Sequence, residues 1–158
     1  MKKYVFCLIL TLSLSSVGYA QNVDNLLKKV SSTENVDKVK IGGFLMALGK
    51  MFGGVGDMPV ARGINGVEVY DLSGCDSKFK QELKNEFNKI KDGNGYETLI
   101  YAKDGGEGVR IMVKKDKKNI IKEMVILCMD KKDPAIIRLS GKIHEKDIAE
   151  LVNEYKNK

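Results

Sequence analysis

Residues that commonly build metal and catalytic sites are scarce in this sequence. It contains one histidine, three cysteines and no tryptophan. The single histidine, His144, excludes the paired-histidine spacing of many zinc sites, and no two cysteines have the C-x-x-C spacing. No spacing of serine, cysteine, histidine or acidic residues singles out a catalytic set. We therefore expect a protein that has no cofactor or metal and is not an enzyme.

Long apolar runs are also rare, and the only one lies at the N-terminus. Lys2 and Lys3 precede an apolar stretch at residues 4–14, and small residues at positions 18 and 20 follow it. This is the three-part pattern of a secretory signal peptide. A membrane-spanning helix needs about 20 apolar residues, which is more than this stretch offers. We expect residues 1–20 to be removed by cleavage between Ala20 and Gln21.

The remaining residues, 21–158, suit a single domain. Removing residues 1–20 takes away two lysines and no acidic residue, so the formal net charge falls from +6 to +4. Proteins that bind nucleic acid usually concentrate much more basic charge on one face, and no nucleic-acid partner is expected here. After signal removal no segment is apolar and long enough to be transmembrane.

Loss of the signal peptide also removes Cys7 and leaves an even pair, Cys75 and Cys128. In an oxidising compartment such a pair can form a disulfide. The alternative is two buried thiols that pack as small apolar residues. The position of Cys128 inside the apolar run at residues 124–129 favours this alternative. Both interpretations stay open on the sequence alone.

The first half of the mature chain mixes helical and extended patterns. In the third expected helix, Phe79, Leu83 and Phe87 recur at helical spacing after an Asp76 cap. We expect helices at residues 24–32, 42–52 and 77–90 and strands at residues 35–41 and 67–72, with a glycine-rich loop at residues 53–66.

The second half changes to β-type patterns. Four such runs lie at residues 96–103, 108–114, 119–129 and 134–143, and short turn sequences separate them. Short connections indicate antiparallel neighbours, so we predict a four-stranded meander. A last helix is expected at residues 145–155. The fold class is therefore α+β, with an antiparallel or mixed sheet that ends in a C-terminal meander and with helices packed on one face.

Strand alternation suggests a candidate interaction face. Val109, Ile111 and Val113 share one face of their strand, and we expect this face to contact the helices. The opposite face would then carry Arg110 and Met112, together with Arg138 from the last strand. Arginine and methionine are enriched at protein interfaces, so these three residues form the predicted interaction face. The alternative is a solvated sheet with scattered apolar residues.

The order of these pieces resembles a known family. The segments that carry the resemblance are VDKVKIGGFLMALGKM, VEVYDLSGC, YETL, VRIMVK, IKEMVI and IRLSGKI. Together they are similar to the small exported bacterial family called domain of unknown function 4252. The resemblance implies an envelope protein of Gram-negative bacteria. It implies no activity and no functional residues, so no site residue is carried over.

We expect an exported protein, periplasmic or secreted, that acts as a non-catalytic binding or interaction module of the cell envelope. Its partner would be an unknown envelope protein or a small ligand. One alternative is a small envelope enzyme that uses carboxylates or Cys75. Another is a carrier of a hydrophobic ligand, which would need a cavity between helices and sheet.

Overall fold

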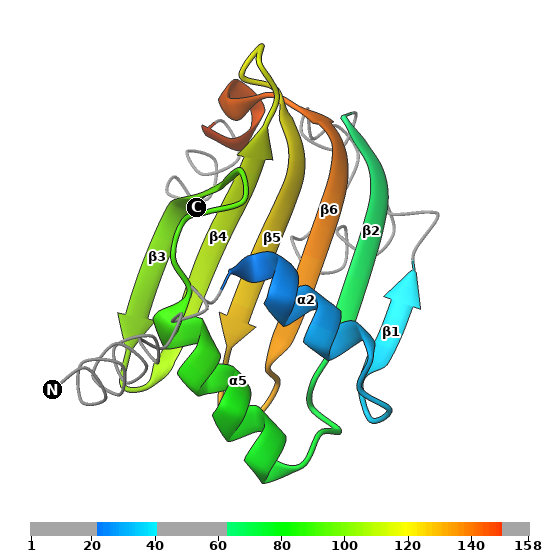
Figure 1. Ribbon diagram of the computed structural model, residues 1–158, viewed down its shortest axis with the longest axis vertical. Coiled ribbons are helices and arrows are strands. Elements are labelled where there is room, and N and C mark those ends of the chain that lie inside the picture. Colours follow the sequence, from blue (N-terminus) through cyan, green and yellow to red (C-terminus); the bar gives the residue numbers. More distant parts are fainter. Residues whose placement is uncertain (1–21, 41–62, 150–158) are drawn as a thin grey trace, which may run out of the picture.

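The computed structural model describes residues 22–40 and 63–149 (Figure 1). The elements in chain order are α2 (Val23–Ser31), β1 (Asp37–Lys40), β2 (Ile64–Asp71), α5 (Ser77–Lys89), β3 (Tyr96–Asp104), β4 (Glu107–Lys115), β5 (Ile121–Met129) and β6 (Ala135–Ile143). A helical turn follows at residues 145–149. The predicted signal peptide with its cleavage site at Ala20 and Gln21, the predicted helix at 42–52 and the end of the last helix lie outside the described residues.

All six strands form one antiparallel sheet in the order β1-β2-β6-β5-β4-β3. Strands β3 to β6 are the predicted meander, and each pairs with its neighbour in the chain. Strand β2 then pairs with the free side of β6, so the last strand lies inside the sheet. The predicted α+β class and the meander are confirmed.

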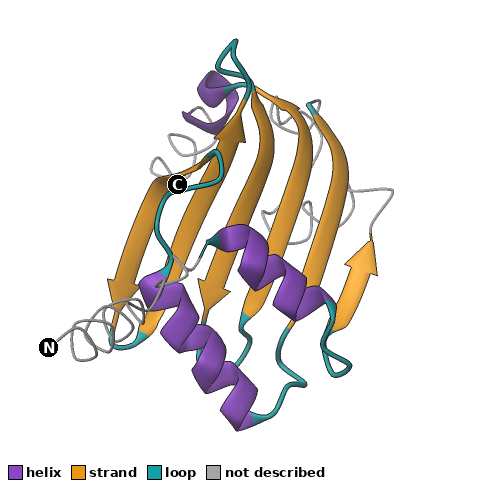
Figure 2. Cartoon of the chain, in the orientation of Figure 1, coloured by secondary structure: helices purple, strands orange, loops and turns teal. Residues whose placement is uncertain are grey.

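Helices α2 and α5 cover the same face of the sheet, which we call the helix face (Figure 2). Asn22 caps α2 by accepting a hydrogen bond from the Asn25 amide, and Asp76 caps α5 in the same way from Phe79. Apolar residues of α2 at helical spacing face the sheet and are buried: Val23, Leu26, Leu27 and Val30. Within residues 22–40 and 63–149, no helix has the length and apolar content needed to cross a membrane.

The predicted orientation of the sheet is wrong. Arg110 and Met112 lie on the helix face, where they are 7% and 0% exposed, and Arg138 lies on the same face. Val113 belongs instead to the cluster on the far face. Alternation correctly determines which residues share a face, but both faces of β4 hold apolar residues. The pattern therefore could not determine which face the helices cover.

The far face of the sheet is also apolar. Its buried cluster consists of Val67, Val113, Ile121, Met124, Ile137, Leu139 and Ile143. Ile148, in the helical turn at residues 145–149, packs against this cluster. The sheet therefore has two hydrophobic clusters, one on each face. Charged side chains within its strands differ from these apolar surroundings.

Candidate functional site

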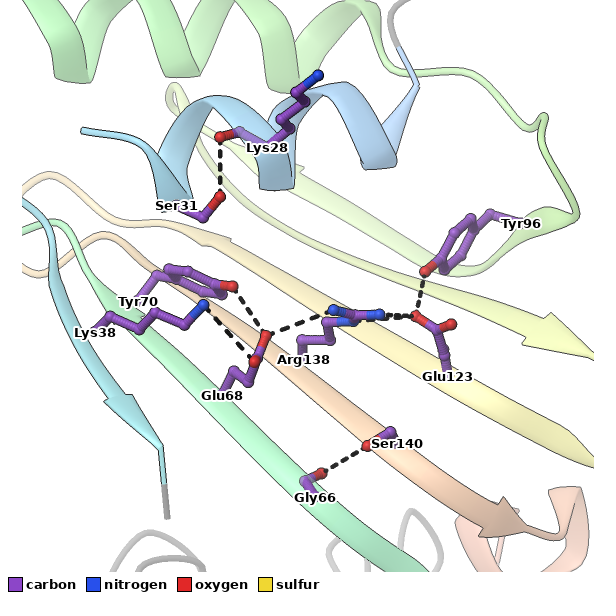
Figure 3. A network of polar contacts seen from close by, with 10 residues as sticks. All are labelled: Lys28, Ser31, Lys38, Gly66, Glu68, Tyr70, Tyr96, Glu123, Arg138 and Ser140. Atoms are coloured by element: carbon purple, nitrogen blue, oxygen red, sulfur yellow. Dashed lines mark hydrogen bonds and ion pairs between the residues drawn. The ribbon is translucent and has the colours of Figure 1, made fainter. Parts of the chain in front are cut away.

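Five polar side chains from five strands lie in a line across the helix face, beside α2 (Figure 3). In spatial order they are Lys38, Glu68, Arg138, Glu123 and Tyr96, and we call them the polar row. Contacts between neighbours connect all five. Because strand pairing places Glu68 directly opposite Arg138, the register of β2 and β6 fixes the centre of the row.

Glu123 binds both of its neighbours in the row, Arg138 and Tyr96, through one carboxylate oxygen. Its Oε2 accepts hydrogen bonds from Arg138 Nε and Nη2, at 3.0 and 2.7 Å. The same oxygen accepts a hydrogen bond of 2.8 Å from the Tyr96 hydroxyl. Charge-assisted bonds of this kind are among the strongest in proteins, so the carboxylate is held in one position.

Glu68 joins the other half of the row. Its carboxylate lies 3.5 Å from Arg138 Nη1 and 3.7 Å from Lys38 Nζ. The buried Tyr70 donates a hydrogen bond of 2.9 Å to Glu68, and the Lys38 ammonium lies 4.9 Å from the centre of the Tyr70 ring. Charges therefore alternate along the row, from lysine to glutamate to arginine to glutamate.

The surroundings keep the row charged near neutral pH. Burial alone would raise the pKa of Glu123, but hydrogen bonds from Tyr96 and Arg138 outweigh it and lower this pKa below its ordinary value. Burial, followed by the bond to Glu123, raises the pKa of Tyr96 far above that of a free tyrosine. Glu123 is thus ionised and Tyr96 protonated, which is the combination that the hydrogen bond requires.

The four charged members of the row remain accessible to a partner, whereas Tyr96 is buried. The side chains of Lys38, Glu68, Glu123 and Arg138 are 33%, 23%, 24% and 37% exposed. Next to them, a Cβ added at Gly66 would lie 2.8 Å from the Ser140 hydroxyl oxygen, closer than atoms normally approach. Because Gly66 has no side chain, nothing projects from the sheet at this position beside the charged residues.

Arg110 does not belong to this row, although it faces the same side. Its guanidinium donates a hydrogen bond to the backbone carbonyl of Ile90, at the C-terminal end of α5. It also lies 4.2 Å from the centre of the Tyr101 ring and 5.6 Å from that of Phe87. We call Arg110, Phe87, Tyr101 and Ile90 the arginine cage. Arg110 and Met112 are thus core residues, and of the three residues of the predicted interaction face only Arg138 is partly exposed.

In the structure Cys75 and Cys128 are free thiols, and no disulfide joins them. Cys75 packs with the cluster on the helix face and donates a hydrogen bond of 3.3 Å to the Asn35 carbonyl. Cys128 alternates with the helix-face residues Leu127 and Met129 of β5, so it points to the far face. A bridge would have to cross the sheet. Burial raises the pKa of both thiols.

Cys75 and His144 lie at opposite ends of the sheet. Cys75 follows β2 near the start of β6, since the Leu72 amide donates to the Pro134 carbonyl. His144 directly follows the other end of β6. In the part of the chain that the structure describes, no group of histidine, cysteine and acidic residues could hold a metal ion.

Sequence reasoning found only Arg138 of the polar row. The other members come from strands that are distant in the chain, and the β2–β6 pairing that joins them was not predicted. A signal was nevertheless present. Glu68 and Glu123 are acidic residues that lie between apolar residues in the strand sequences VEVYDL and IKEMVIL. A charge at such a position marks a place where the strand is partly open to solvent or where a polar partner meets the charge.

The family model described as "Domain of unknown function (DUF4252)" matches residues 27–151, which include every strand of the sheet. The resemblance seen in the sequence is therefore confirmed. No curated protein and no solved structure matches the chain.

Proposed function

Because the chain belongs to the DUF4252 family, whose description assigns no activity, we propose its role from its own residues. It is an exported protein of the cell envelope and a non-catalytic binding module. The polar row beside α2 is its binding surface, and the partner is a polar surface or segment of another envelope component. The observation that carries this proposal is the set of fixed, partly exposed charges of alternating sign.

Fixed charges favour specific recognition. Arg138 and Glu123 each have most of their side chain covered, so their position costs desolvation energy that a pair of apolar residues would avoid. Charged groups that are already ordered lose little further freedom when a partner binds. Alternating signs select a partner with the complementary order of charges and oppose like-charged surfaces.

The arrangement of the thiols also favours binding over catalysis. A cysteine nucleophile needs a base within hydrogen-bond reach. Cys75 is the cysteine that lies outside the strands, and the length of β6 separates it from His144. Its raised pKa keeps it protonated at neutral pH, which is opposite to the activation that a nucleophile requires.

Site-specific photocrosslinking in the producing bacterium tests the binding surface. A photoreactive residue replaces Ser140, which lies beside the row, or Lys117, which is exposed at the β4–β5 turn and serves as control. We expect a discrete adduct at position 140 that is absent at position 117 and disappears in Arg138→Glu. No adduct at position 140, or an adduct that Arg138→Glu leaves unchanged, would refute the polar row as the binding surface.

The mature N-terminus tests export separately. Mass spectrometry of the protein from the envelope fraction should find a chain that begins near Gln21. A chain that retains residues 1–20 in the cytoplasmic fraction would contradict an envelope role. This result does not depend on where the partner binds.

A further inference from the structure

Exposed apolar side chains gather at one edge of the sheet. Among the described residues, five large apolar side chains are exposed, and four of them lie on β3 or its neighbour β4. These are Leu99, Ile100, Tyr101 and Val109, which are 36–46% exposed. Strand β3 ends the sheet, since one of its sides pairs with β4 and no described strand pairs with the other. An open strand edge with apolar residues is a template for a further strand.

A bulge limits the part of β3 that can pair. The register with β4 shifts between Thr98 and Ile100, which leaves Leu99 as an extra residue. Beyond the bulge, residues 100–104 alternate regularly. Ile100, Ala102 and Asp104 point to the far face, whereas Tyr101 and Lys103 point to the helix face.

A groove of about 430 Å³ lies beside this segment on the far face. Ala102, Val109 and Cys128, neighbours across β3, β4 and β5, contribute to its lining, which also includes Asp104. The groove and the exposed side chain of Ile100 are therefore on the same face of the same edge.

We propose that β3 binds β3 of a second copy of this chain. The two strands are antiparallel, with Ala102 on the twofold axis, and the two sheets join into one. In this register all five residues of each segment face a residue that points to the same side. Moving the axis to Tyr101 would place Leu99 of one copy against Lys103 of the other and so bring the bulge into the pairing.

On the far face of this dimer, the exposed side chain of Ile100 in one copy lies beside the groove of the other copy. Ile100 of one copy lies opposite Asp104 of the other, at the margin of the groove that Ala102 and Val109 help to line. The twofold axis repeats the contact, so each copy contributes both parts. On the helix face, Tyr101 of one copy lies opposite Lys103 of the other, a favourable pair of ring and cation. No two like charges lie directly opposite each other.

The other edge of the sheet is a poorer site for pairing. Strand β1 has four residues, Asp37–Lys40, three of which are charged in sequence. Short, charged edge strands are a common protection against association. Its one exposed apolar residue, Val39, provides a matched control position.

Sedimentation analysis of the purified protein over a concentration range tests the dimer. The wild type should be a dimer that dissociates on dilution. Ala102→Glu places two carboxylates opposite each other on the axis and should raise the dissociation constant about tenfold or more. Ala102→Lys should do the same. A mixture of the two variants should restore the dimer, because residue 102 then faces the opposite charge. Val39→Glu should have no effect.

Crosslinking provides a second measurement of the register. In antiparallel pairs, opposite Cα atoms lie about 4.5–5.5 Å apart, within the range of a disulfide. Ala102→Cys, with Cys128 replaced by serine, should therefore form a covalent dimer under mild oxidation, whereas Val39→Cys should not. A wild type that stays monomeric at every concentration overturns the proposal. So does a dimer whose dissociation constant is unchanged by Ala102→Glu.

Discussion

Arg110 and Arg138 face the same side of the sheet, but their surroundings differ. Arg110 lies in the arginine cage, 7% exposed, and donates a hydrogen bond to the Ile90 carbonyl at the end of α5. Arg138 lies in the polar row, where its side chain is 37% exposed and its partners are carboxylates. Coverage by helices therefore determines whether an arginine of this face stabilises the core or remains accessible for recognition.

The largest effect is expected on the covered side. Phe87 is 2% exposed and supplies one ring of the arginine cage, so Phe87→Ala should lower the free energy of unfolding by about 3–5 kcal/mol. Urea unfolding measures this change. Phe79→Ala is the control, because Phe79 lies on the same helix but is only partly buried, and its loss should be clearly smaller. Equal losses would mean that the cage does not contribute to the core.

A smaller loss is expected for Arg110→Ala, about 2 kcal/mol. The substitution leaves the Ile90 carbonyl without its donor and removes the guanidinium from the aromatic rings. Arg138→Ala should cost at most about 1 kcal/mol, because its ion pairs are partly exposed. Thermal and urea unfolding of both variants would test the contrast directly. A greater loss for Arg138→Ala would reverse the assigned roles.

The polar row should contribute stability that depends on pH. The folded state lowers the pKa of Glu123, so its contribution is present above the ordinary value near 4.5 and is lost as the pH falls through the lowered pKa. We expect Glu123→Gln to cost about 1 kcal/mol at pH 7 and almost nothing in strong acid. Urea unfolding at several pH values measures this difference, and the same loss at every pH would contradict it.

The smallest expected effect is the coupling between the two arginines. They lie on β4 and β6, with β5 between them, and the partners described above for Arg110 and for Arg138 have no residue in common. The losses of Arg110→Ala and Arg138→Ala should therefore add to within about 0.5 kcal/mol in the double variant. A larger deviation in urea unfolding would show that the cage and the row act as one unit.

Local patterns predicted the elements of the fold well. The Asp76 cap, the spacing of Leu83 and Phe87, and the short turns of the meander each depend on residues close in the chain, and the structure contains all of them. The orientation of the sheet was not predictable in this way. Both faces of strand β4 hold apolar residues, and a long side chain such as Arg110 can be buried when its charge contacts a carbonyl and aromatic rings.

The candidate site was mostly beyond prediction. The polar row needs Glu68 and Arg138 to be neighbours, and this depends on the long-range pairing of β2 with β6. Alternation within either strand says nothing about which strand lies beside it. The separation of Cys75 and Cys128 could not be predicted for the same reason. That they lie on opposite faces can be recognised only once the sheet is assembled.

The position of β6 has a consequence for synthesis. Among the described strands it is the last in chain order, yet it fills the place between β2 and β5. Until residues 135–143 emerge, β2 and β5 each present an open edge, and the sheet consists of two separate parts, β1-β2 and β5-β4-β3. Contacts between such distant segments also form slowly. Until β6 is made, these open edges of the nascent chain are available to pair with other strands.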